Sequence, residues 1–271
     1  MTSGKQARAD RADRAAKIAA ATPKESRLKL IAGVLVAVLA IAGIGVAIWM
    51  GVRSSGSTEG KAPAGATGES GGIVLARGAS AKPGAPTIDV YEDFQCPHCK
   101  DYHELLGPTL NTMADSGQYK VVIHMKNFME KQATGVRGSA STKVANATAC
   151  AADAGKFREY ESAAFAGQAE AENGFPDAAL ERFAQQAQIT GGALDTWKQC
   201  VKDGKYNAYV ERVDSTSAKA GINGTPTYLV NGTSLDLGRI TSPQAFQQAV
   251  AAAAAAKPSS AATPSSAATT K

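Results

Sequence analysis

Cysteine and histidine are scarce in this sequence, which limits its metal chemistry. The 271 residues include four cysteines and three histidines. Cys96 and Cys99 have the Cys-x-x-Cys spacing that structural zinc sites also use, but such a site needs two further ligands. No second Cys-x-x-Cys provides them. We therefore expect neither a metal nor a cofactor at this pair.

An excess of basic charge is missing from most of the chain. Residues 1–29 carry eight Lys and Arg side chains and three acids, and this surplus equals the net charge of +5 of the whole sequence. The remaining residues are therefore balanced. A nucleic-acid interface needs basic residues clustered on a folded surface, so the distribution argues against nucleic acid as a partner.

One long apolar run, 30–52, contains no charged side chain. A helix over it would be about 34 Å long at ~1.5 Å per residue, enough to cross a bilayer core of about 30 Å. A cleaved signal peptide is the alternative, but its apolar core is only about 7–15 residues long. We expect a single-pass, uncleaved anchor in the cell membrane. The basic flank predicts a cytoplasmic N-terminus and an extracytoplasmic chain from residue 53.

Composition divides the chain after the span into three parts. Gly, Ser, Ala and Thr dominate 53–72, as in flexible tethers. Residues 258–271 are rich in Ala, Ser, Thr and Pro, which is typical of a disordered tail. Residues 73–257 have the size of one globular domain.

The globular part predicts an α/β domain whose two halves are separated by helices. Strand patterns cover 73–75, 87–94, 119–125, 227–230 and 233–237, and helical patterns cover 99–113, about 137–220, and a last helix starting at Ser242-Pro243. Asn231-Gly232 is a two-residue hairpin turn signal. A helical block of about 80 residues thus lies between a βαβ half and a ββα half.

The segment Cys96-Pro97-His98-Cys99 follows the strand 87–94 and opens a helix, which is the setting of a redox-active dithiol. Helix amides and the helix dipole stabilise a thiolate at Cys96, the more exposed attacking sulfur. Cys99, one turn inside the helix, is the resolving sulfur. Pro97 suits the first turn, and a protonated His98 adds positive charge beside the thiolate. A structural disulfide is less favoured, since so short a loop saves little entropy.

Two further groups of residues complete the candidate site. Thr225-Pro226 precedes the strand 227–230; a cis proline facing the dithiol and an ordinary proline at a strand start remain alternatives. Glu92 and Asp93 are candidate proton shuttles for Cys99, although Asp93 could instead cap the helix.

The other two cysteines, Cys150 and Cys200, lie in helical segments 50 residues apart. We favour a structural disulfide, on the order of 3–4 kcal/mol, over two buried thiols or a redox relay. His103 and His124 each stand alone, and we expect both to be structural.

The segments Tyr91–Cys99 and Gly224–Gly232, with the helical block between them, resemble the DsbA family of thiol:disulfide oxidoreductases over about 85–255. That resemblance implies a thioredoxin fold with an inserted helical domain, a cis Pro226 and a Cys150–Cys200 disulfide. The anchor and the second cysteine pair resemble the actinobacterial branch. In many thioredoxin-fold proteins an acid lies six residues before the first cysteine, where this chain has Val90.

The resemblance also implies a function and partners. It indicates a membrane-anchored, monomeric thiol oxidase that introduces disulfides into unfolded secreted proteins with free cysteines. A quinone-linked membrane reoxidase, of the DsbB or vitamin K epoxide reductase-like type, would restore its disulfide. A reductase or isomerase of the same fold is the alternative, and a non-catalytic binding or chaperone module is a further one.

Overall fold

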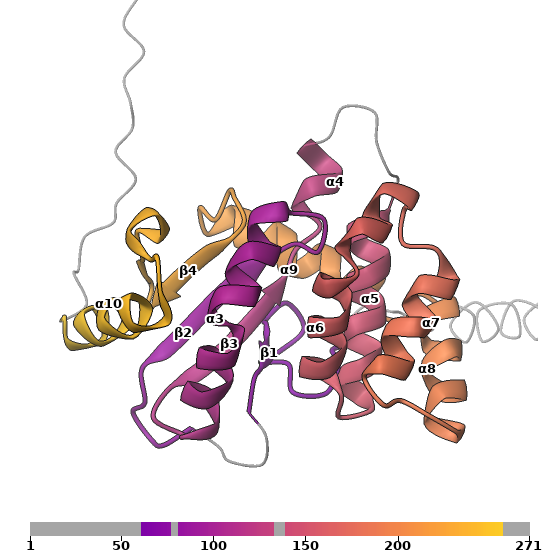
Figure 1. Ribbon diagram of the computed structural model, residues 1–271, viewed down its shortest axis with the longest axis horizontal. Helices are drawn as coiled ribbons and strands as arrows, with labels where there is room; N and C mark the ends of the chain where they lie inside the picture. Colours follow the sequence, from indigo (N-terminus) through magenta and orange to yellow (C-terminus); the bar gives the residue numbers. More distant parts are fainter. Residues whose placement is uncertain (1–60, 77–80, 133–138, 257–271) are drawn as a thin grey trace, which may run out of the picture. The chain divides into compact units, whose positions relative to one another are not determined.

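The computed structural model describes residues 61–76, 81–132 and 139–256, which form one sheet with helices on both faces (Figure 1). Five strands lie in the order β1-β3-β2-β4-β5. The central strand β2 (Thr87–Glu92) is parallel to β3 (Lys120–Met125) and antiparallel to β4 (Thr227–Val230). The short strands β1 (Ile73–Val74) and β5 (Thr233–Ser234) form the edges. The predicted α/β class is confirmed.

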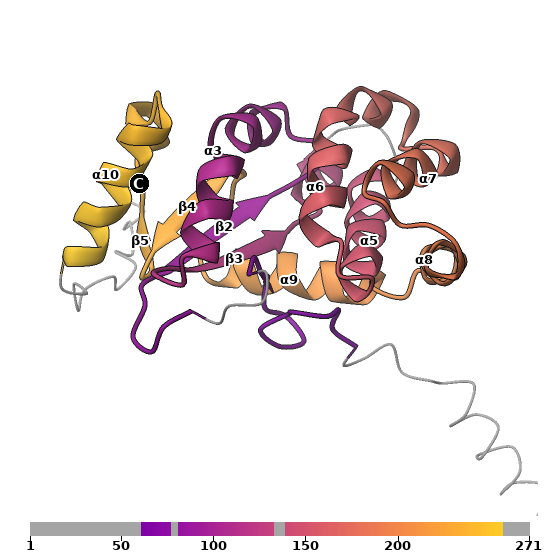
Figure 2. The same ribbon diagram turned by 60° about the horizontal axis from the view of Figure 1, so that its bottom comes forward.

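Alternation along β2 decides which of its side chains reach the core. Ile88, Val90 and Glu92 are buried, whereas the residues between them are partly exposed. The neighbouring strand β3 instead has three consecutive buried residues, 121–123, because helices cover both of its faces. Helix α3 (Pro97–Asp115) and helix α9 (Asn207–Lys219) lie on opposite sides of the sheet (Figure 2).

Helix α3 begins two residues earlier than the pattern indicates, at Pro97. Proline fits there because its fixed φ suits a helix and its missing N–H would have no intrahelical partner. Cys96 is the N-cap residue, in extended conformation with φ −79° and ψ 117°. The dithiol therefore spans the junction between a loop and the first helical turn.

The predicted helical block is present as a bundle beside the sheet (Figure 1). Its central helix α5 is almost entirely buried and rich in alanine, whose small side chain lets five neighbouring helices approach. Helix α9 contacts both α5 and β3, and so joins the bundle to the sheet. The elements are α4 (Phe128–Gln132), α5 (Ala140–Asp153), α6 (Phe157–Ala166), the 3-10 helix η1 (Gln168–Asn173), α7 (Asp177–Gln186), α8 (Gly192–Lys202) and α9.

The C-terminal half contains the hairpin, with one strand shorter than expected. Asn231 and Gly232 have φ of 49° and 80°, the positive values that a tight hairpin turn requires. β5 ends at Ser234, and a 3-10 helix η2 (Leu237–Arg239) replaces the end of the predicted strand. The Asp236 carboxylate accepts from Gly238 N at 3.1 Å, which stabilises that turn. Helix α10 (Pro243–Ala255) then begins as predicted, with Ser242 as its cap.

Residues 61–72, expected to belong to the flexible tether, pack against the domain instead. Tyr209 on α9 donates its hydroxyl to Gly71 O at 2.6 Å, and Arg212 donates to Glu69 O at 3.0 Å. Composition could not indicate these contacts, because the segment contributes backbone carbonyls and the partners lie more than 130 residues away along the chain.

The predicted membrane anchor at 30–52 lies outside the described residues, as do the tail 1–29, residues 53–60 and the tail 258–271. Within 61–76, 81–132 and 139–256, no helix has both the length and the apolar character that a membrane crossing requires.

Candidate functional site

The two sulfurs of the dithiol are both largely buried, at 5% exposure for Cys96 and 2% for Cys99. Cys96 is the more exposed of the two, as expected, although the difference is small. Its Sγ donates to the carbonyl oxygen of Thr225 at 3.4 Å. Both cysteines are free thiols here.

Local hydrogen bonds favour ionisation of Cys96. They lower its pKa from 9.0 to about 6, chiefly because the Cys99 thiol donates to the Cys96 sulfur. The backbone amides of Cys99 and His98 add to this effect, while burial opposes it. At neutral pH the first cysteine is therefore a thiolate, the nucleophilic form.

Cys99 has the opposite tendency. Burial raises its pKa well above 9.0, and the neighbouring Cys96 raises it further. The backbone N–H of Asp93 donates to its sulfur at 3.5 Å. The two sulfurs, one turn apart, thus differ strongly in acidity, as the attacking and resolving roles require.

The two residues between the cysteines act mainly through the backbone. Pro97 occupies the first helical position. The His98 side chain is 79% exposed and its Nδ1 lies 3.6 Å from Asp101 Oδ2. Its ring thus faces a carboxylate as well as solvent, and its contribution to the Cys96 thiolate is its amide.

The Thr225–Pro226 peptide bond is cis. Its loop leads into β4, which pairs with β2. The sheet therefore places the Thr225 carbonyl next to Cys96, although 129 residues separate them. Of the two alternatives that the sequence left open, the structure has the cis proline beside the dithiol.

Asp93 is a fully buried acid at the centre of a hydrogen-bond network. Its Oδ1 accepts from Gln95 N at 2.9 Å and from the Ser141 hydroxyl at 2.6 Å, and its Oδ2 accepts from Met129 N at 2.9 Å. It therefore links the dithiol loop to α4 and α5 and does not cap α3. Burial raises the pKa of Asp93 to about 7.

Glu92 lies on the inward face of β2 and is 3% exposed. Burial, followed by the charge of Glu161, raises its pKa well above 4.5. The charge of Glu92 also contributes to the raised pKa of Cys99. Val90, two residues earlier in β2, lies on the same buried face but is apolar. Glu92 is therefore the acid that β2 presents to the core.

Two residues of the helical block belong to the site and were missed by the sequence analysis. Gln168 donates its side-chain N–H groups to the carbonyls of Phe94 and Cys96 at 2.8 and 2.9 Å, which holds the loop before α3. Glu161 faces Glu92. Helical spacing offered a signal for Glu161, because it lies four residues from both Phe157 and Phe165 on the apolar face.

The remaining histidines pack against neighbouring aromatic rings. His103 stacks on Phe165 with ring centroids 4.7 Å apart, and burial lowers its pKa to about 4. His124 Nε2 lies 2.9 Å from Asp89 Oδ1, and its ring stacks on Tyr91. Their side-chain hydrogen-bond partners are Ser162 for His103 and Asp89 for His124.

The structure contains the Cys150–Cys200 disulfide, with an S–S distance of 2.02 Å. It links the middle of the bundle, α5, to its outer helix α8. The pair is thus part of the helical block and is separate in sequence and structure from the dithiol loop.

One cluster among the described residues has the composition of a metal site. Possible donor atoms of Glu92, His103 and Glu161 lie within 4.8 Å of one another. We assign no metal to it, because a proton between the two carboxyl groups satisfies them equally well.

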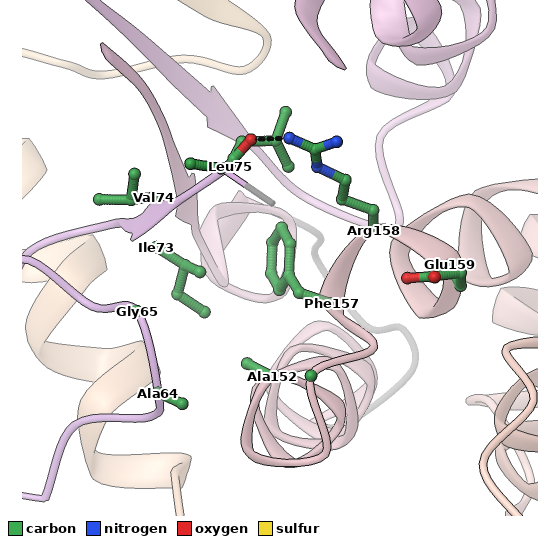
Figure 3. A pocket seen from close by; sticks show the side chains of 11 residues that line it. Ala64, Gly65, Ile73, Val74, Leu75, Ala152, Phe157, Arg158 and Glu159 are labelled. Carbon is green, nitrogen blue, oxygen red and sulfur yellow. Dashed lines mark hydrogen bonds between the residues drawn. The ribbon is translucent and has the colours of Figure 1, made fainter. Parts of the chain in front are cut away.

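The cavity drawn in Figure 3 is separate from the dithiol. It encloses about 170 Å³ between the N-terminal segment and the helical block, and Ile73, Phe157 and Arg158 are among its lining residues. Arg158, on the wall of the cavity, donates a hydrogen bond to the Leu75 carbonyl (Figure 3). It also donates to both carboxylate oxygens of Asp115. No residue of the dithiol loop lines this cavity.

Comparison with known proteins agrees with this geometry. A family model described as thioredoxin matches residues 77–262. The chain resembles the oxidised DsbA of Mycobacterium tuberculosis with 25% identity and a TM-score of 0.54, over 69% of this chain and 94% of that one. No curated protein matches the sequence.

Two other solved structures show the same fold. The MdbA thiol-disulfide oxidoreductase of Actinomyces oris has 20% identity and a TM-score of 0.59, over 72% of this chain and 98% of that one. The MdbA protein of Corynebacterium diphtheriae has 21% identity and a TM-score of 0.57, over 72% of this chain and 96% of that one.

Proposed function

Because the chain belongs to the thioredoxin family, we propose that its Cys96/Cys99 pair works as an extracytoplasmic thiol oxidase that introduces disulfide bonds into secreted or cell-envelope proteins. The chain is a thiol–disulfide oxidoreductase of the DsbA/MdbA type. The direction of electron flow and the substrates are what we propose.

The observation that carries the proposal is the difference in acidity between the two sulfurs. A Cys96 pKa of about 6 stabilises the reduced, thiolate-bearing form relative to an ordinary thiol. A more stable reduced form makes the corresponding disulfide a stronger oxidant. This favours oxidation of substrates over a thioredoxin-like reducing role.

The proposed reaction has two steps. A substrate thiolate attacks Cys96 of the disulfide, the Cys96–Cys99 bond breaks, and Cys99 leaves with the electron pair and takes up a proton. A second substrate thiolate attacks the substrate sulfur of this mixed disulfide, and Cys96 leaves as a thiolate. The substrate loses two electrons and gains a disulfide, while the enzyme pair is reduced.

The loop carrying Thr225 and Pro226 suits the binding of an extended substrate chain. It contacts Cys96 through the Thr225 carbonyl, so a backbone laid along this loop would bring its cysteine to the attacking sulfur. Glu92 and Asp93 are the acids placed to exchange protons with the dithiol, because both are buried next to it and have raised pKa values.

The location and partners rest on the sequence. The uncharged run 30–52 supports a single-pass anchor with the catalytic domain outside the cytoplasm. We propose unfolded secreted proteins with free cysteines as substrates, and a membrane reoxidase of the DsbB or vitamin K epoxide reductase-like type as electron acceptor. The protein would work as a monomer and would bind no nucleic acid.

The Cys96/Cys99 reduction potential, measured with oxidation of a reduced unfolded protein, tests the proposal. We expect a potential well above the about −270 mV of thioredoxin, together with disulfide formation that Cys96→Ser abolishes. A potential near that of thioredoxin, with insulin reduction and no substrate oxidation, would instead establish the reductase alternative.

A further inference from the structure

Glu161 is a buried acid that the thiol–disulfide steps above leave unused. It lies on α6 in the helical block and is 4% exposed, and it faces Glu92 on the central strand, which is 3% exposed. Their carboxylate oxygens lie within 4.8 Å of each other. The contact joins the sheet carrying the dithiol to the inserted bundle.

Two carboxyl groups in this position cannot both be ionised without a large cost, because each is removed from water and repels the other. No described N–H or O–H group donates to Oε1 of Glu92 or to Oε1 of Glu161. One proton held between the two groups satisfies both as a single O–H···O bond and leaves one negative charge.

The charges around the pair define its proton affinity. Arg158 on α6 acts on Glu161, and Asp93 follows Glu92 in the chain. The other titratable side chains that interact with the pair are Cys99 and His103 on α3 and Tyr228 on β4. Burial raises the Glu161 pKa to about 7 and, with the Glu161 charge, raises that of Glu92 well above its usual range. The two groups therefore titrate as one coupled pair in which both pKa values are raised.

We propose that Glu92 and Glu161 form one proton-sharing carboxyl pair that supplies the Cys99 proton and takes it back during the dithiol cycle. This inference rests on the proposed function, since only a dithiol that turns over needs such a proton. Glu92 interacts electrostatically with Cys99, and Glu161 acts through Glu92 as a positioning residue.

The proton and electron balance is simple in both directions. When substrate attack breaks the Cys96–Cys99 bond, Cys99 leaves as a thiolate and receives a proton from the doubly protonated pair. During reoxidation, the Cys96 thiolate forms a mixed disulfide with the disulfide of the reoxidase. In that step the other reoxidase sulfur leaves as a thiolate. Cys99 then returns its proton to the pair and attacks Cys96, and the reoxidase sulfur bound to Cys96 leaves as the second thiolate. The reoxidase gains the two electrons.

Ellman's reagent separates the two sulfurs in the reduced, detergent-solubilised full chain. The first thiolate is released when Cys96 attacks the reagent, and the second when Cys99 attacks the resulting mixed disulfide. We expect Glu92→Gln and Glu161→Gln each to slow the second phase at neutral pH by about 10²-fold, the size typical of general acid–base catalysis. Both substitutions should also change the pH profile of the second phase. The rate of the first phase should change by less than about twofold, because Cys96 needs no proton transfer from the pair.

A matched control and a double variant make the test specific. Glu159→Gln removes an acid from the same helix and should leave the second phase unchanged. The double variant should be no slower than the slower single one, because the two residues act as one unit. A second-phase pH profile in Glu161→Gln equal to that of the unmodified chain would overturn the inference, as would multiplicative effects in the double variant.

Infrared spectroscopy of the unmodified chain gives an answer that does not depend on how the variants fold. We expect a protonated-carboxyl band at neutral pH whose intensity changes when the dithiol is oxidised. Its absence, or a stoichiometric metal ion in the purified protein, would refute the shared proton. Failure of the thiol-oxidase proposal would appear separately, in the reduction potential and in the oxidation of substrate.

Discussion

Replacing Cys99 by alanine should raise the pKa of Cys96, because it removes the hydrogen bond that contributes most to the low value. A hydrogen bond to a charged group contributes about 1.5–3 kcal/mol. At about 1.36 kcal/mol per pKa unit, its loss corresponds to a rise of about one to two units. The remaining amide donors, from the backbone of residues 98 and 99, stay in place and keep the pKa below that of a free thiol.

The assay is the rate of Cys96 alkylation by iodoacetamide as a function of pH, with thiolate absorbance as a second measure. His98→Ala is the matched control, because its side chain is 79% exposed while its contribution to the thiolate is a backbone amide that alanine retains. A Cys96 pKa in Cys99→Ala that equals the unmodified value would refute the reasoning.

The same ionisation makes the stability of the reduced form depend on pH. The folded pKa of Cys96 is lowered from 9.0 to about 6. The resulting stabilisation is fully present above the unfolded pKa and is lost as pH falls through the folded one. Three units correspond to at most about 4 kcal/mol. The disulfide form has no Cys96 thiol to titrate. The reduced form should therefore become more stable relative to the disulfide form as the pH rises from 6 to 9.

Three further predictions concern the scaffold around the dithiol. Replacing Cys150 and Cys200 by alanine should lower the free energy of unfolding by about 4 kcal/mol, measured by urea denaturation, and unchanged stability would contradict a structural role. Asp214→Asn should lower the free energy of unfolding by about 3–5 kcal/mol, because the buried Lys126 ammonium, 3.2 Å from that carboxylate, loses its charge partner. A decrease of less than about 1 kcal/mol would contradict this prediction. Gln168→Ala removes two hydrogen bonds to loop carbonyls and should speed amide exchange in the first turn of α3, whereas unchanged exchange would show that the loop is held by other contacts.

Local patterns predicted most of the elements that surround the site. Alternation identified β2 and β4, the Asn231-Gly232 pair identified the hairpin, and Ser242 identified the start of the last helix. These features depend on neighbours within a few residues, so a sequence window contains their cause. The predicted end of β5 was wrong, because the Asp236 side chain caps a 3-10 turn where the sequence predicted continued strand pairing.

Long-range contacts could not be predicted from local sequence patterns. The segment 61–72 looked like a tether but binds α9 through its backbone carbonyls. Asp93 could have capped α3 but instead accepts from residues of α4 and α5. In each case the decisive partner comes from an element whose position depends on the packing of the whole domain.

The sequence alone determined the chemistry of the dithiol, because Cys96 and Cys99 owe their proximity to three residues of chain and one helical turn. Only the tertiary structure decided how this pair is tuned. It brings the Thr225 carbonyl to Cys96 across the β2–β4 pairing, and it packs α6 so that Glu161 meets Glu92. Acidity depends on burial and on charges within a few ångströms in space, and those neighbours come from segments up to 129 residues apart.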